Sequence, residues 1–256
     1  MSLTGDLKPP LTLEQLAYLF RLRMDDLPGD VVSAQSAWQN DDSALLWSNE
    51  EICVWADEAQ HEFAARRPIL DSTTAAICQI GTTANQQTVT YDNRIIYIDR
   101  VKWVETSSDD EFLLEKKDQH WMDDMYVGWD KITGNSYAGQ PCNYVDYVEE
   151  NKLKLWRIPE GAGTLHMTVY RYPINRLTWT QRHKALEIDP NYHMDLLDWM
   201  QFRAYTKRDA ETENPDLAAQ HEATFERRIG VRPSAHLQTV RRRERRMGRR
   251  VRARYV

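Results

Sequence analysis

The spacing of apolar residues along the chain predicts where helices and strands form. Near the N-terminus, apolar residues recur every three or four positions, at Leu13, Leu16, Ala17, Phe20 and Met24. This spacing is typical of one face of an α-helix. Thr12 and Gln15 form a capping box that would begin the helix, and Pro28-Gly29 would end it. The pattern therefore predicts an amphipathic helix.

A second stretch has the same spacing, at Ile52, Trp55, Ala56, Ala59 and Phe63. Ser48 and Glu51 form its capping box, and Arg66-Arg67-Pro68 would end it. Two helices with the same apolar face predict a packed helical pair.

From about Ala75 the apolar period falls towards two and β-branched residues become frequent, which is typical of strands. Residues 88–91 and 95–98 flank Asp92-Asn93, which predicts a hairpin turn. Further strands are expected at 152–155 and at 165–169, separated by turn residues at 159–163 and ended by Pro173. Residues 111–131 stay ambiguous, because a helical spacing of apolar residues there is interrupted by Gly128.

Helical patterns return after Ile188. Asp189-Pro190 would start a helix through 192–205, whose residues are apolar on nearly all sides, so we expect it to be central and buried. Asn214-Pro215 starts another helix, with Gly230 as its stop. The predicted fold is α+β: an α-helical bundle from residues 1–71 and 186–230, an inserted, mostly antiparallel β domain at 72–185, and an extended basic C-terminal arm at 231–256.

Charge sets the C-terminal arm apart from the rest of the chain. Residues 240–256 hold nine arginines and one acid, a net charge of +8. The whole chain has a net charge of −6, so subtraction leaves −14 for residues 1–239. So dense a positive charge resists packing into a core, and guanidinium makes planar bidentate contacts that lysine cannot make. We therefore expect a docking arm, with a solvated tail as the alternative. Its docking residues are Arg241, Arg242, Arg243, Arg245, Arg246, Arg249, Arg250, Arg252, Arg254, Tyr255 and Val256.

The composition predicts a folded protein. Apolar residues make up 41 % of the chain, with nine Trp and twelve Tyr, which suffices for a core. The three cysteines are widely spaced and form no CxxC, so the sequence signals neither a disulfide framework nor a zinc site. Without an 18-residue apolar run or an apolar region near its start, the chain is expected neither to span a membrane nor to carry a signal peptide.

Candidate sites for metals and catalysis are weak. Glu58 and His61 have the spacing used in di-iron bundles, but such a site needs a second pair, so a surface pair is the better interpretation. The cluster Asp118, His120, Asp123 and Asp124 could bind a cation, but its spacing matches no calcium loop, so a solvated acidic loop is the favoured interpretation. His193 is interpreted as a hydrogen-bonded structural histidine. No GxSxG, P-loop or GxGxxG motif occurs, so we predict no enzyme activity, no cofactor and no metal.

Five tryptophans could form a stacking platform for sugars or bases. They are Trp103, Trp121, Trp129, Trp156 and Trp179. Core and subunit-contact positions are the favoured interpretation, because large aromatic side chains dominate cores and interfaces.

One succession of segments is more specific than composition. It runs through Gly139-Gln140-Pro141, Tyr144, Leu153-Lys154-Leu155, residues 158–165, Tyr170-Arg171-Tyr172-Pro173, Pro190-Asn191-Tyr192-His193 and residues 205–211. Over roughly residues 48–230 this order resembles the tailed-bacteriophage head-to-tail connector family, also called adaptor or head-completion proteins. Its motifs are packing and turn signals.

The resemblance implies a structural virion protein at the head–tail junction, made in the host cytoplasm. Its copies, usually twelve, would form a ring between the portal protein and a tail (nozzle or stopper) protein. Double-stranded DNA would pass through the ring without sequence recognition, and the C-terminal arm would dock on the portal. Two other functions stay open: a nucleic-acid-binding protein that grips phosphate with its arginines, and a carbohydrate-binding tail component.

Overall fold

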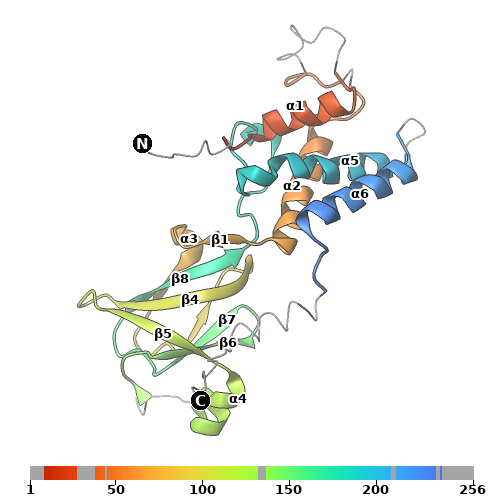
Figure 1. The fold of residues 1–256 in the computed structure, drawn as a ribbon. Helices are drawn as coiled ribbons and strands as arrows, with labels where there is room; N and C mark the ends of the chain where they lie inside the picture. The colour runs from red at the N-terminus through yellow and green to blue at the C-terminus, as the bar shows by residue number, and fades with distance from the viewer. Residues whose placement is uncertain are drawn as a thin grey trace, which may run out of the picture. The chain divides into compact units, whose positions relative to one another are not determined.

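A computed structural model describes residues 9–27, 38–43, 45–131, 137–208, 212–234 and 237. The described chain is α+β, with a mostly antiparallel sheet (Figure 1). It divides into two compact units. The helical unit comprises the described residues up to Ile69 together with Tyr172–Arg232, and the sheet unit comprises Leu70–Arg171 together with the described residues after Arg232.

The helices of the helical unit share one apolar core. They are α1 (Leu13–Arg23), α2 (Asn49–Arg66), α5 (Leu196–Thr206) and α6 (Pro215–Ile229), with the 3₁₀ helices η3 (Trp179–Gln181) and η4 (Pro190–Asp195). Each contributes its apolar stripe; Leu16, Ile52 and Phe225, for example, are all fully buried. The burial of apolar surface from several helices on one core supplies most of the stability of such a unit.

The caps begin the first two helices as predicted. The hydroxyl oxygens of Thr12 and Ser48 accept N–H groups of Gln15 and Glu51, whose side chains accept the cap N–H groups in return. The capping boxes are therefore confirmed. Helix α1 ends at Arg23, ahead of Pro28-Gly29, which lies outside the described residues.

The third predicted helix begins later than the sequence suggests. Asp189 caps the expected turn, but Pro190–Asp195 form a 3₁₀ helix, and α5 starts at Leu196. Helix α5 packs against α1, α2 and α6, so its apolar surroundings explain why it is apolar on nearly all sides. The cap at Asn214 and the stop at Gly230, where φ is +111°, are confirmed for α6.

The sheet unit is built on one eight-stranded sheet. Its strands are β1 (Ile69–Asp71), β2 (Gln79–Thr82), β3 (Thr88–Thr90), β4 (Ile95–Glu105), β5 (Glu111–Lys117), β6 (Asn143–Glu149), β7 (Lys152–Trp156) and β8 (Gly163–Arg171). The strand order is β1-β8-β4-β5-β6-β7-β3, and β2 also pairs with β8. β5 and β6 pair in parallel, which needs a longer connection than a hairpin.

The predicted hairpin around Asp92-Asn93 is wrong. β3 pairs with β7, whereas β4 pairs with β5 and β8. The carboxylate of Asp92 accepts the N–H of Arg94, which forms a bend. Tyr91 is held elsewhere, because its N–H donates to the Asn151 carbonyl and its hydroxyl to Asp146. The turn residues therefore redirect the chain between distant strands, since turn chemistry specifies a bend but no pairing partner.

The ambiguous stretch 111–131 contains both kinds of structure. It forms strand β5, the short helix α4 (Gln119–Met125) and the 3₁₀ helix η1 (Trp129–Lys131). Met122 and Trp129 point into a small core with Val145 and Trp156. Of the residues with helical spacing, Met122 and Trp129 therefore pack in a core, and the segment as a whole combines a strand with two short helices.

Candidate functional site

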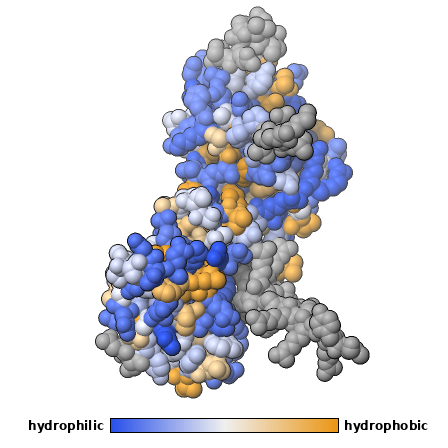
Figure 2. Space-filling model, turned by 60° about the vertical axis from the view of Figure 1, so that its left-hand side comes forward, coloured by the Kyte–Doolittle hydropathy of each residue, from blue (hydrophilic) through white to orange (hydrophobic). Residues whose placement is uncertain are grey.

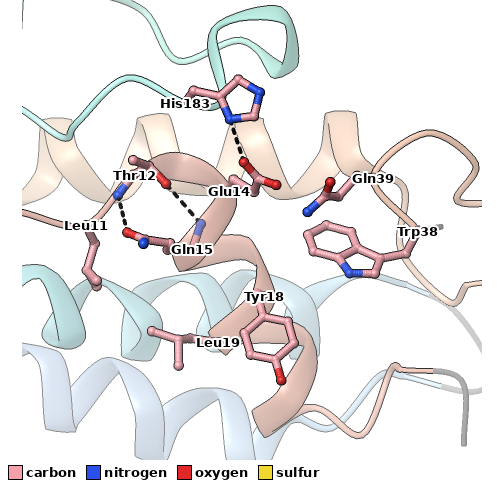
Figure 3. Close-up of a pocket in the computed structure, with 9 residues that line it drawn as sticks. All are labelled: Leu11, Thr12, Glu14, Gln15, Tyr18, Leu19, Trp38, Gln39 and His183. Atoms are coloured by element: carbon pink, nitrogen blue, oxygen red, sulfur yellow. Dashed lines mark hydrogen bonds and ion pairs between the residues drawn. The ribbon is translucent and has the colours of Figure 1, made fainter. Parts of the chain in front are cut away.

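An open groove of about 890 Å³ lies in the helical unit (Figure 3). It is lined by Leu11, Thr12, Glu14, Gln15, Tyr18, Leu19, Trp38, Gln39 and His183. Hydrogen bonds hold the neighbouring segment beside the start of α1: the N–H of Leu186 donates to the carbonyl of Leu11, and that of Glu14 to the carbonyl of Arg182, both at 3.0 Å. The groove is thus built from α1 and two segments far from each other in sequence.

The groove combines apolar and ionisable side chains. Nδ1 of His183 lies 2.6 Å from the Glu14 carboxylate, at the mouth of the groove. Trp38 is 2 % exposed, and its indole N–H has no hydrogen-bond partner among the described residues. The hydroxyl oxygen of Thr12 is occupied by its helix cap. Polar and apolar side chains thus share the lining, and two of the polar groups, the Glu14 carboxylate and the Thr12 hydroxyl, already have partners within the protein.

His193 is structural, as predicted. It is fully buried, its Nδ1 accepts the N–H of Leu11 at 2.9 Å, and its Nε2 lies 2.9 Å from the carbonyl oxygen of Ile188. Both ring nitrogens therefore hold the entry to α1 against the segment before α5.

Three of the residues considered for metal binding, Glu58, His61 and Asp123, are engaged in other contacts. Glu58 pairs with Arg203, and the His61 ring lies against Tyr172. Asp123 accepts the indole N–H of Trp129 at 2.8 Å, so it supports a buried tryptophan. Within the ranges that the structure describes, no group of three or more His, Cys, Asp or Glu side chains is arranged to hold a metal ion.

The five tryptophans do not form one platform. Trp103, Trp129 and Trp156 are buried in the sheet unit, as the core interpretation predicted. Trp121 is 37 % exposed, and Trp179 belongs to the helical unit, where it contacts Trp38. Stacking on a shared surface is therefore excluded for the set as a whole.

Two cysteines are unsuited to nucleophilic chemistry. Burial raises the pKa of Cys53 to about 12 and that of Cys78 to about 11. Both therefore stay protonated at neutral pH, and the thiol is a weak nucleophile compared with the thiolate.

A surface that the sequence did not single out lies around α4 in the sheet unit. We call it the α4 surface: Trp121, Met125, Val127 and Tyr137, which are 37 %, 56 %, 94 % and 49 % exposed. On the face drawn in Figure 2, hydrophobic residues are interspersed with hydrophilic ones. Exposed Trp, Tyr and Met side chains are enriched at protein–protein contacts. The signal available in the sequence was the apolar run between acids, interpreted there as a solvated acidic loop.

The predicted docking residues of the arm, Arg241 to Val256, lie outside the described residues. The last described arginines pair within the helical unit: Arg228 with Asp195, and Arg232 with Glu62. In the part of the chain that the structure covers, no helix is long and apolar enough to cross a membrane.

The family comparison accounts for the order of the segments. The model of the SU10 adaptor protein family matches residues 25–254, which is most of the chain. No curated protein matches the chain. The resemblance seen over residues 48–230 is thereby confirmed and extended towards both ends. The chain belongs to the SU10 adaptor protein family, a family of phage head–tail adaptors.

Proposed function

We propose that this adaptor forms a ring, of twelve copies, between the portal protein and the first tail protein of a virion. The match to the adaptor family over residues 25–254 carries the proposal. The helical unit would form the ring body as a helical bundle, and the sheet unit would face the tail. Separate cores in the two units support this division, because each can contact a different partner without disturbing the other.

The arginine-rich arm would dock on the portal. Its nine arginines among residues 241–254 offer forked donors for carboxylates on a partner. Twelve arms that bind together would turn weak single contacts into a tight joint. A segment of this composition pays its ordering entropy only when it docks.

The remaining chain would let DNA pass. Residues 1–239 have a net charge of −14, which repels phosphate where acids face the channel. The role is structural, so the protein would act in the virion without catalysis.

Removal of residues 240–256 tests the docking role. Infected cells that supply only the truncated protein should make heads that fill with DNA but lose it or take no tails. A chain with all nine arginines changed to lysine is the matched control, since it keeps the charge and loses the forked geometry of guanidinium. Its virion yield should fall between those of the wild type and the truncated chain. Normal virion yield from the truncated chain would refute the docking role.

The positive charge of the arm also favours a second function, the binding of nucleic acid. Each phosphate neutralised contributes about −0.9 to the slope of log K against log salt. Tight duplex binding with a slope of about −6 or steeper would support this second function. Binding to isolated portal rings, with no duplex binding at physiological salt, would support the adaptor ring.

A further inference from the structure

The α4 surface exposes anchored aromatic side chains. The ring of Trp121 contacts Tyr126, and the ring centres of Tyr126 and Tyr137 lie 4.4 and 5.3 Å from that of Trp156, both in tilted geometry. Trp156 is 4 % exposed and belongs to the small core with Met122, Trp129 and Val145. The exposed rings are therefore held in place before any partner arrives, which lowers the entropic cost of binding.

The same surface is acidic. Residues 118–130 contain four aspartates and neither lysine nor arginine. Asp124 and Asp130 are exposed, and neither carboxylate makes an ion pair with any described residue, while the ammonium of Lys154 lies 3.4 Å from the backbone carbonyl oxygen of Asp130. An apolar patch with unpaired carboxylates around it fits a partner that alternates apolar and cationic side chains.

This chain contains such a segment. Residues 240–256 place nine arginines among Val240, Met247, Val251, Tyr255 and Val256. Arginine suits this partner for two reasons: it pairs with carboxylates and it stacks on aromatic faces. The sheet unit already uses the second contact, because the ammonium of Lys117 lies 4.6 Å from the centre of the Trp121 ring.

We propose that the α4 surface binds residues 240–256 of a second copy of this chain. A segment that leaves one copy and docks on the next makes a head-to-tail contact, the type that closes into rings when the rotation is right. The contact gathers copies before the portal is reached, and the portal then takes over the same arginines. Only this last step rests on the proposed function, because association between copies is measured without the portal.

Two full-length variants separate the halves of the contact. The surface variant carries Asp124→Lys and Met125→Lys, both exposed on α4 and outside the core. The arm variant carries Arg245→Gln, Arg246→Gln, Arg249→Gln and Arg250→Gln. Leu113→Lys is the control, because Leu113 is 61 % exposed on β5 of the same unit and lies outside the α4 surface. Sedimentation measures self-association of each protein at low and at high salt.

The wild-type protein should self-associate at low salt and dissociate at high salt, as screening weakens exposed charge pairs. Each variant alone should associate at least about tenfold more weakly, whereas the Leu113→Lys control should match the wild type. An equal mixture of the two variants should form pairs, since one supplies an intact surface and the other an intact arm.

A wild type that stays monomeric, or a mixture that forms no pairs, would overturn the proposal. So would self-association of either variant at wild-type strength, or loss of association in the control. Portal binding by the arm variant and the wild type tests the proposed function separately. A chain that fails the mixing test yet binds portal through its arginines would leave that function standing.

Discussion

The helical unit and the sheet unit differ in how far their structure can be traced to nearby residues. In the helical unit, the caps at Thr12, Ser48 and Asn214 each bond within three residues, and each begins a helix where the sequence places one. In the sheet unit, β3 finds its partner β7 more than sixty residues along the chain. The backbone hydrogen bonds of a helix join residues close in sequence, whereas those of a strand need a partner strand that its own sequence does not specify.

The comparison changes when the buried charges are considered. The helical unit depends on a distant contact too: the fully buried guanidinium of Arg21 bonds the Asp26 carboxylate, the Trp47 carbonyl and the Asn49 side chain. The sheet unit has a counterpart in Arg171, whose Nε donates to Asp71 at 2.7 Å. Local signals therefore determine where most elements begin, while contacts between distant residues, apolar and polar, hold the elements of each unit together.

Arg21→Met should have the largest effect. Burial lowers the pKa of the Arg21 guanidinium and Asp26 opposes that shift, so the charge is kept inside by its partners. Removal of one member of a buried ion pair costs about 3–5 kcal/mol, since the other charge is left uncompensated. Hydrogen exchange in rising urea should show earlier opening of helical-unit peptides and unchanged protection in the sheet unit.

Arg23→Met is the matched control for this prediction. Arg23 lies two residues further along α1 and is exposed. The control should open within about 0.5 kcal/mol of the wild type, as is usual for surface substitutions. Equal losses in the two variants would show that helix propensity, and not the buried contact, is responsible.

Asp71→Asn should have an intermediate effect, confined to the sheet unit. Burial alone would raise the pKa of Asp71, but hydrogen bonds from Thr73-Thr74 and from Arg171 hold it well below its usual range. Hydrogen bonds to a charged group contribute about 1.5–3 kcal/mol, which sets the expected loss at neutral pH. Asp99→Asn, at an exposed position on β4, is the control and should leave stability unchanged.

The sign of the pH dependence follows from the lowered pKa. The Asp71 carboxylate stabilises the folded state above its unfolded pKa of about 4, and this contribution is lost as pH falls through the lower folded value. Urea titrations of the wild type and Asp71→Asn should therefore converge as the pH drops below about 4. A difference that stays constant from neutral to acid pH would show that the charge of Asp71 contributes nothing.

The limits of prediction from sequence follow the same division. The starts of α1, α2 and α6 and the alternating strands around Leu153 and Leu165 could be predicted, because their signals lie within a few residues. The pairing of β3 could not, since Asp92-Asn93 forms the same bend whether or not the flanking strands pair. Gly163 shows a related failure: it lies in expected turn chemistry, yet it begins β8, where a Cβ would come within 3.0 Å of the Trp103 indole.

The candidate surfaces were harder to predict than the fold. The role of His193 could be predicted because a polar residue in a buried helix start needs partners. The groove could not, because His183 and Glu14 are 169 positions apart and meet only through the packing of the helical unit. The α4 surface could not be predicted either, since the same helical spacing places Met122 inside and leaves Met125 exposed.

Ser48→Ala should have the smallest effect. The hydroxyl oxygen of Ser48 accepts the N–H of Glu51 at 3.2 Å, and loss of such a cap costs about 1 kcal/mol. Urea unfolding of the helical unit measures the loss, and Ser107→Ala, at an exposed turn of the sheet unit, is the control. A loss as large as that of Arg21→Met would mean that the Ser48 cap contributes as much to the free energy of unfolding as the buried contacts of Arg21, and does more than set the start of α2. The expected ratio of about three- to fivefold separates the two roles: the residues that make a helix easy to predict contribute little of the free energy that keeps it folded.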